Sequence, residues 1–273
     1  MVRSVLTKFQ PYSASRYLKA IPKLLSQLNC IGKSWALQAI NALQRKPPIP
    51  PPNLRFLVAG TDDIGWFIRS GQLAARSMQD LLEHHGAKIE RLDAILDFGC
   101  GAGRVIRNFY RMKGPDICGT DYNLTLIEWC KQNLGFAHFQ VNEMAAPLAY
   151  QDEKFDFIYV LSVFTHLRES QQLFWIGELS RVLKPGGYLL ITVHGETYYL
   201  PQLLPDDQAR FLNGELIVYG ADGEGSNICT VFHPKEYVHK KFADGLEIVD
   251  HIPEGALGNP RQDIYLFRKA AIA

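Results

Sequence analysis

Short apolar runs alternate with longer segments of helical periodicity from residue 92 to the end of the chain. Five runs are continuous enough to predict buried strands, at residues 93–98, 116–120, 137–141, 155–160 and 187–193. Strands separated by helices are typical of a parallel sheet with right-handed crossovers. Two later runs, 246–249 and 264–267, predict an antiparallel pair at one edge of that sheet. The pattern therefore predicts an α/β fold.

A separate pattern precedes the sheet. Apolar residues recur at helical spacing between residues 18 and 43, and a proline-rich run at 47–52 follows. Because consecutive prolines form a stiff, extended spacer, this run marks a boundary. We expect a helical N-terminal extension with its spacer over residues 1–52 and one α/β domain over residues 53–273.

Two segments outside the strands are candidates to cover a ligand. A helix is predicted from 67 to 85, and Trp66, Phe67 and Gly71 at its start either fold over a ligand or pack in the core. A long insertion rich in aromatic residues, 195–245, follows the fifth strand. Ligands of open α/β sheets bind outside the carboxyl ends of the strands, where this insertion would lie. We interpret residues 195–245 as a substrate cap.

Charge is divided unevenly along the chain. The net charge is +1, but residues 1–61 contain nine lysines and arginines and no acid, so residues 62–273 carry −8. An acidic main domain argues against a broad nucleic-acid surface, and a nucleic-acid partner is not expected. Three interpretations of the basic residues 1–46 stay open: a helix pair packed on its own domain, an arm that docks on an anionic membrane or an acidic partner, and a cleaved transit peptide.

The cysteines and the hydropathy narrow the class of protein. Five cysteines, at positions 30, 100, 118, 130 and 229, are odd in number and lack metal-type spacing, so we expect reduced thiols and no metal site. No apolar run is long enough to cross a bilayer. The expected location is cytoplasmic, with peripheral membrane association left open. Hydrolase, kinase and metalloprotease motifs (G-x-S-x-G, P-loop, H-E-x-x-H) are absent.

The strongest candidate for chemistry is the turn after the first strand. Residues 97–104 read DFGCGAGR, and a helical segment is predicted to follow over residues 105–112. Glycines there allow the close approach of backbone to a ligand and the φ values of a tight turn. A dinucleotide fingerprint would have glycine or alanine where this chain has Arg104, which disfavours NAD. Asp121 closes the second strand, about 20 residues past the glycines, where such folds bind ribose hydroxyls. A ligand with a ribose and no pyrophosphate suits this pair of acids.

In these residues the chain resembles the class I, Rossmann-like S-adenosylmethionine (SAM) dependent methyltransferases of the small-molecule type. Asp97 and the three glycines match the family motif D/E-x-G-x-G-x-G, and Asp121 matches its ribose acid. Asn142 stands where the family more often has an aspartate beside the adenine. Residues 155–160 resemble its F-D-x-I/V strand, and residues 181–191 resemble its R-x-L-K-P-G-G turn.

The resemblance implies a fold and a methyl donor. The fold would be a seven-stranded, mostly parallel sheet with helices on both faces, an antiparallel edge strand and here a helical N-terminal extension. The donor would be SAM. The implied cofactor-binding residues are Asp97, Gly99, Cys100, Gly101, Gly103, Asp121, Tyr122 and Asn142.

Methyl transfer from a sulfonium is an in-line displacement, so the protein mainly aligns the reactants and excludes water. A general base is needed only where the acceptor must lose a proton. His166, after the fourth strand, and His194, at the end of the fifth, are the candidate catalytic residues, and His233 in the cap is a weaker one. Each could instead have a scaffolding role.

The expected activity is methyl transfer to an oxygen or nitrogen of a small-molecule or glycan-type acceptor. Two alternatives stay open: an RNA or protein methyltransferase recruited by the basic arm, and a SAM-binding module without turnover. No Asn/Asp-Pro-Pro-Tyr string is present, which disfavours adenine N-methylation.

Overall fold

The computed structural model describes residues 32, 36, 38, 39, 44, 46–259 and 261–271. The chain forms two compact units, residues 1–49 and 50–273. In the first unit, Gly32, Ala36, Gln38 and Ala39 are helical. The rest of the predicted N-terminal extension lies outside the described residues.

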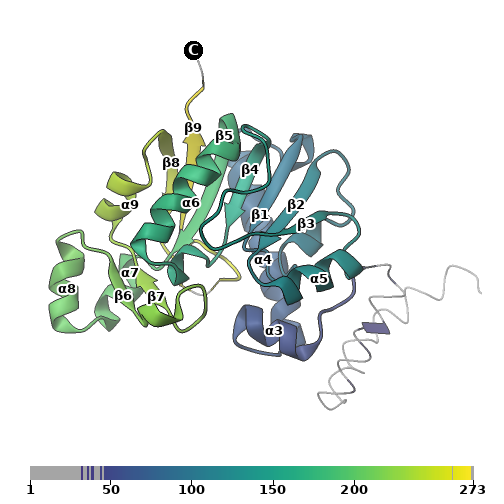
Figure 1. Cartoon of the computed structure of the whole chain (residues 1–273), viewed down its shortest axis with the longest axis horizontal. Helices are drawn as coiled ribbons and strands as arrows, with labels where there is room; N and C mark the ends of the chain where they lie inside the picture. The colour runs from purple at the N-terminus through teal and green to yellow at the C-terminus, as the bar shows by residue number, and fades with distance from the viewer. Residues whose placement is uncertain are drawn as a thin grey trace, which may run out of the picture. The chain divides into compact units, whose positions relative to one another are not determined.

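The second unit is built on a seven-stranded sheet with the order β3-β2-β1-β4-β5-β9-β8 (Figure 1). Its strands are β1 Ala94–Phe98, β2 Asp116–Asp121, β3 His138–Val141, β4 Phe155–Val160, β5 Leu183–Val193, β8 Leu246–Ile252 and β9 Asp263–Lys269. Strands β1 to β5 pair in parallel, while β9 pairs antiparallel with both β5 and β8. The predicted fold class is confirmed, with the antiparallel strand one position in from the edge.

Helices cover both faces of this sheet because alternate side chains of each strand point to opposite faces. Leu96 and Ile158 pack with α6 (Glu169–Val182) and α9 (Lys235–Lys241) in one buried cluster. Ile95 and Phe157 pack with α4 (Ile64–His84) and α5 (Leu124–Asn133) in the other. Figure 1 shows α6 in front of the strands and α4 behind them. Among the helices that the structure describes, none is long and apolar enough to span a membrane.

Two helical predictions need correction. The helix predicted from 67 begins at Ile64, because the Asp63 carboxylate accepts the free N–H groups of Gly65 and Trp66. A helix predicted over 105–112 is wrong, since only a 3₁₀ turn, η2 (Ile106–Phe109), forms there. The preceding glycines have positive φ values, and the Asn108 amide donates to the carbonyls of residues 104 and 105, so a short turn replaces a regular helix.

The predicted cap divides into two parts. Residues 196–232 form a small subdomain of α7 (Glu196–Tyr199), η4 (Leu200–Gln202), α8 (Pro205–Leu212), β6 (Ile217–Tyr219), η5 (Ala221–Gly223) and β7 (Thr230–Phe232). Strands β6 and β7 pair with each other, and Phe211 and Phe232 are buried in this subdomain's own core. By contrast, Tyr237 and Phe242 of the α9 region belong to the main core. The inserted structure is therefore shorter than the predicted 195–245.

Candidate active site

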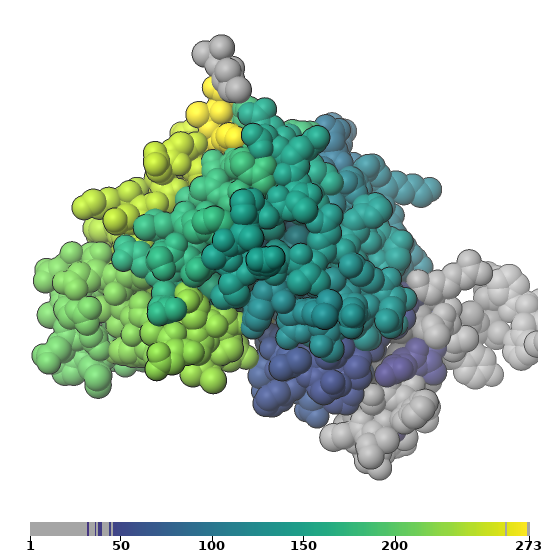
Figure 2. All heavy atoms as spheres, in the orientation of Figure 1, coloured from purple at the N-terminus to yellow at the C-terminus, as the bar shows by residue number. Residues whose placement is uncertain are grey.

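A cavity of about 790 Å³ lies at the carboxyl ends of β1, β2, β4 and β5. Its walls come from the glycine loop, from α3 (Pro52–Ala59) and from the cap. Figure 2 shows α3, in blue-violet, and the cap, in green, next to each other at the lower edge of the drawn face. The cavity thus lies where α/β sheets bind their ligands.

The glycine loop has no room for side chains at two positions. Gly99 has φ 78°, and a Cβ there would lie 2.3 Å from Val163 Cγ2. Gly101 has φ 55°, and its Cβ would lie 2.8 Å from Val58 Cγ2. Both residues line the cavity. The loop therefore offers bare backbone to a ligand, which a side chain would prevent.

The other two predicted residues of the loop differ in placement. Gly103 does not line the cavity, and its φ of 74° and the contact with Leu134, 2.4 Å from an added Cβ, show that it serves packing. The Cys100 side chain does line the cavity, and burial raises the pKa of its thiol well above the ordinary value. A neutral, buried thiol packs and does not act as a nucleophile.

Asp97 places a buried carboxyl group at the cavity. Its side chain is buried, and Oδ2 has no hydrogen-bond partner among the described residues. Burial raises the pKa of Asp97 to about 7, although the nearby Tyr159 hydroxyl and the Arg104 charge oppose the rise. A cationic group of a ligand would compensate this carboxylate.

Both carboxylate oxygens of Asp121 accept hydrogen bonds from the backbone. Oδ2 accepts the N–H of Gly101 at 2.9 Å, and Oδ1 accepts the N–H of Asn123 at 2.9 Å. Asn123, not Asp121, caps helix α5. Burial raises the pKa of Asp121, while the two backbone hydrogen bonds lower it. A carboxylate has further lone pairs, so Asp121 can still accept ribose hydroxyls from the cavity.

Tyr122 and Asn142 are the remaining residues predicted to bind the methyl donor. The Asn142 amide donates to the Glu143 carbonyl at 3.0 Å, which leaves Oδ1 as an acceptor at the cavity. The Tyr122 hydroxyl donates to the Gly225 carbonyl at 2.6 Å, and the Gly225 N–H donates to the His166 carbonyl at 2.8 Å. These bonds fasten the cap loop 224–228 over the cavity.

The two candidate histidines line the same cavity, with ring centroids 6.5 Å apart. His166 Nδ1 donates to the Cys229 carbonyl at 2.6 Å, and burial lowers its pKa. His194 Nδ1 donates to the Val231 carbonyl at 3.1 Å, and burial together with the neighbouring His166 lowers its pKa to about 4. Because a carbonyl only accepts, Nδ1 carries the proton in both rings and Nε2 carries the lone pair.

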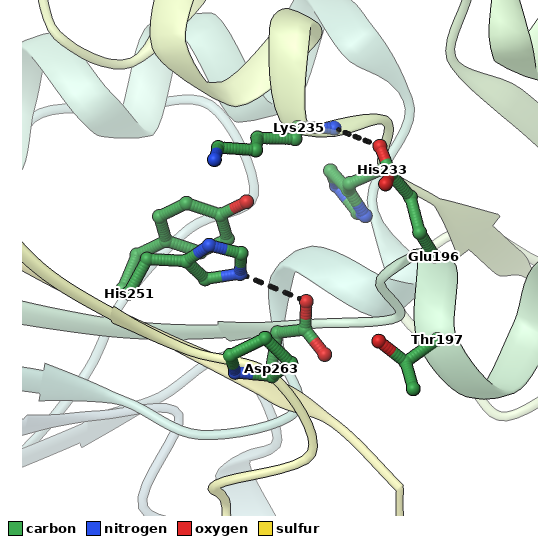
Figure 3. A pocket seen from close by; sticks show the side chains of 8 residues that line it. Glu196, Thr197, His233, Lys235, His251 and Asp263 are labelled. Atoms are coloured by element: carbon green, nitrogen blue, oxygen red, sulfur yellow. Dashed lines mark hydrogen bonds and ion pairs between the residues drawn. The ribbon is translucent and has the colours of Figure 1, made fainter.

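His233 lies elsewhere. It lines a second cavity of about 360 Å³, beside the His251–Asp263 pair, whose Nε2 and Oδ2 atoms are 2.9 Å apart (Figure 3). Burial lowers the pKa of His233 to about 3, and its Nε2 faces the Gln172 amide oxygen. Since His233 does not line the main cavity, the structure gives no support to its role as a base there.

Several cavity residues were missed by sequence reasoning. Asn259 and Gln262, from the connection between β8 and β9, are buried and line the cavity. Ser162 has a φ of 58°, a strained value for serine, and hydrogen-bonds with both. Polar residues in a hairpin connection carry no local signal of burial, which explains the omission.

Of the three predicted cover residues, only Trp66 lines the cavity. Phe67 is fully buried in the fold. Gly71 packs against the glycine loop, since a Cβ there would lie 2.0 Å from the Arg104 carbonyl oxygen. Among the residues that the structure describes, no group of histidines, cysteines or acids is arranged to hold a metal ion.

Comparison with known proteins finds a methyltransferase domain within the chain. Residues 96–191 match the methyltransferase domain family. A probable methyltransferase from Aspergillus luteorubrus is 27% identical over 182 residues, 62% of this chain and 63% of that protein. The sterol 24-C-methyltransferase of Schizosaccharomyces pombe is 31% identical over 98 residues, 34% of this chain and 25% of that protein. Matches thus span less than two thirds of either relative. Other matches are a tRNA N(3)-cytidine methyltransferase from Gallus gallus and a ubiquinone biosynthesis O-methyltransferase from Bradyrhizobium.

Solved structures share the fold. A SAM-dependent methyltransferase from Methanosarcina mazei has a TM-score of 0.52 at 23% identity, covering 70% of this chain and 98% of its own. A SAM-dependent methyltransferase from Mesorhizobium loti has a TM-score of 0.54 at 15% identity. The match covers 71% of this chain and 98% of that protein. Strands β2 to β4 and most of β1 and β5 fall within the segment that matches the domain family. Residues 96–191 thus match a methyltransferase domain, and the fold is that of solved class I, Rossmann-like SAM-dependent methyltransferases.

Proposed function

We propose that this protein transfers the methyl group of SAM to an oxygen or nitrogen of a small-molecule or glycan-type acceptor. One observation carries the proposal: a single cavity is lined by the glycine loop and its two acids on one side and by the cap and two histidines on the other. Its volume of about 790 Å³ is within the usual range for small-ligand sites, about 300–1,000 Å³. Donor and acceptor would meet inside it.

The donor side fits the parts of SAM. Asp121 would bind the ribose hydroxyls, the Asn142 amide oxygen would accept from the adenine amino group, and Asp97 would face the ammonium. When bound, SAM supplies an electrophilic methyl group on a sulfonium. The bare backbone at Gly99 and Gly101 leaves the space that this ligand needs.

On the acceptor side, the hydrogen bonds favour His166 over His194 as general base. Gln262 Nε2 donates to His194 Nε2 at 3.4 Å and occupies its lone pair. The pKa of about 4 also makes His194 a weak base. His166 Nε2 has no such donor among the described residues and lines the cavity. His166 would take the acceptor's proton, and His194 would shape the acceptor site.

The acceptor itself is best found directly. Purified protein is incubated with methyl-labelled SAM and with fractionated small molecules, total RNA or protein extract. Label in a small-molecule fraction supports the proposal. Label that appears only in RNA or protein would instead support a recruited macromolecular methyltransferase, whereas donor binding without any labelled product would indicate a non-catalytic module. Relatives named for sterol, ubiquinone and tRNA substrates differ in their acceptors, so they do not decide between these outcomes.

His166→Asn is expected to lower kcat by about 10²–10⁴-fold, the usual contribution of a general base, while leaving S-adenosylhomocysteine (SAH) affinity unchanged. His194→Asn is the matched variant and should lower kcat less. Steady-state kinetics with the identified acceptor and calorimetry with SAH measure the two effects. A larger loss for His194→Asn would assign the base to His194.

Donor affinity is expected to fall as the pH drops below 7. Only ionised Asp97 attracts the donor's ammonium, and its pKa is about 7, so apparent affinity should fall by up to about tenfold per pH unit below that value. In the protein without ligand, Asp97 changes the folding stability with pH in the opposite direction. Because its pKa is raised, the folded state binds more protons than the unfolded state. This carboxyl therefore lowers the free energy of unfolding as the pH rises from about 4 to 7. Calorimetry from pH 5.5 to 8 checks the first effect. A pH profile that Asp97→Asn does not flatten would contradict it.

A further inference from the structure

Helix α3 buries its one charged side chain and exposes two large apolar ones. Arg55 is 3% exposed, and its guanidinium donates to the Asp62 carbonyl at 2.9 Å and to the Pro50 carbonyl. Phe56 and Leu57, by contrast, are 58% and 52% exposed. A surface helix ordinarily keeps its charged residues in water and its large apolar residues against the protein. The outward position of Phe56 and Leu57 therefore needs an explanation.

Phe56 and Leu57 lie at the opening of the main cavity, because both are exposed and both line it. Tyr122 and Ile228 do the same, and Ile228 is 72% exposed. Eleven large apolar side chains are exposed among the described residues, and these four share one cavity. Figure 2 shows α3 next to the cap, which carries Ile228. Single exposed apolar residues are ordinary, but a group of them beside a ligand cavity marks a binding surface.

The charged side chains of the cavity lie near the glycine loop. Among the described residues that line the cavity, they are Asp97 near the end of β1, Asp121 at the end of β2, and Arg104 directly after the loop. No lysine, arginine, aspartate or glutamate lines the cavity from α3, from the cap, or from the described residues that follow β4 and β5. The part of the cavity that faces away from the loop is therefore uncharged.

The lining around the two histidines is mostly apolar. Leu167, next to His166 in the chain, lines the cavity, and so does Trp175 of α6. The Tyr199 ring centroid lies 4.2 Å from that of His194. Burial lowers the pKa of both histidines, so both rings are neutral at pH 7. A phosphate, carboxylate or ammonium group would lose its water here without gaining a charged partner, which is costly.

We propose that the methyl acceptor is an uncharged, lipid-like molecule. Its reacting group would enter the cavity beside His166, and its hydrocarbon part would extend through the opening over Phe56, Leu57 and Ile228. Contact would remove both the hydrocarbon and these side chains from water, which stabilises the complex. This assignment rests on the proposed methyl transfer and narrows its acceptors, because it favours a hydrocarbon over a glycan.

The first test follows the methyl label. Full-length protein is incubated with methyl-labelled SAM and either an organic-solvent extract of cells, carried by cyclodextrin, or the water-soluble small molecules of the same cells. Label is expected in organic-soluble products. Label confined to water-soluble small molecules would overturn this assignment and leave the proposed function standing. Label found in neither fraction, or only in RNA or protein, would overturn the proposed function and this inference with it.

The second test changes the opening. In the double variant Phe56→Gln, Leu57→Gln, labelling at limiting extract should fall about 10-fold or more, because the hydrocarbon loses two apolar contacts. Both positions are exposed and glutamine is a good helix former, so the fold should be retained. SAH affinity, measured by calorimetry, should stay at the wild-type value. A matching loss of SAH affinity would place these side chains on the donor and contradict the assignment.

The double variant Leu73→Gln, Leu173→Gln is the matched control. These leucines lie on α4 and α6, are also exposed, and do not line the cavity. This variant should label the extract as wild-type protein does. Equal labelling by the two double variants would overturn the assignment. A loss in the Phe56 and Leu57 variant that appears only when phospholipid vesicles carry the extract, and not cyclodextrin, would show docking on a membrane instead.

Discussion

Gly71→Ala is expected to destabilise the protein by about 3 kcal/mol and to weaken donor binding as well. Gly71 lies within α4, and an added Cβ would be 2.0 Å from the Arg104 carbonyl oxygen and 3.0 Å from its carbonyl carbon. Both atoms belong to the backbone, so no side-chain rotation relieves the overlap. Helix α4 and the glycine loop must move apart. Thermal unfolding should show a midpoint lower by about 6–12 °C.

Gly177→Ala is the matched control for this prediction. Gly177 also lies within a helix, α6, but no atom lies within 4 Å of its added Cβ. Alanine there should stabilise the protein by about 0.5–1 kcal/mol, because glycine is a poor helix former. Similar unfolding midpoints for the two variants would show that α4 is not packed on the loop as described.

Asp121→Ala is expected to lower SAH affinity about 100-fold or more. The substitution removes the charged acceptor that we propose for the ribose hydroxyls, and hydrogen bonds to a charged group contribute about 1.5–3 kcal/mol each. It also frees the N–H groups of Gly101 and Asn123, so the loop loses one of its links to β2 and keeps the two backbone bonds to the Thr120 carbonyl. Calorimetry measures the affinity, and circular dichroism checks that the fold is retained.

Asp116→Ala controls for the loss of an acid from the same strand. Asp116 lies at the opposite end of β2, where it pairs with Lys154 at 3.1 Å, and it does not line the cavity. Its replacement should leave SAH affinity unchanged. If Asp121→Ala also left the affinity unchanged, Asp121 would not bind the donor and the proposed binding mode would fail.

The fold was predictable because its strands are apolar enough to stand out. The residues from 94 to 98, and all but Asp156 from 155 to 160, are buried on both faces of the sheet, which requires nearly continuous apolar sequence. The order of the motifs then fixed the topology. What failed was the helix expected over 105–112, because its form depends on tertiary contacts of the loop and not on local propensity.

The lining of the cavity was predictable around the glycine loop and much less so around the two histidines. Asp97 and Asp121 could be found because strand ends carry chemistry in this class of fold. Asn259 and Gln262 reach the cavity only through the path of the β8–β9 connection, which has no periodic pattern. The protonation states of His166 and His194 depend on cap carbonyls far along the chain. The spacing of residues along the sequence does not reveal such partners.

The bonds to Gly225 have a kinetic consequence. One peptide segment is fastened to Tyr122, next to Asp121, and to the backbone of His166, on the side of the cavity proposed for the acceptor. The loop therefore cannot open toward one substrate without loosening its hold near the other. Loop opening limits product release in many enzymes with such covers. Here donor exchange and acceptor entry are expected to share one gate, so that one loop motion limits the exchange of both substrates.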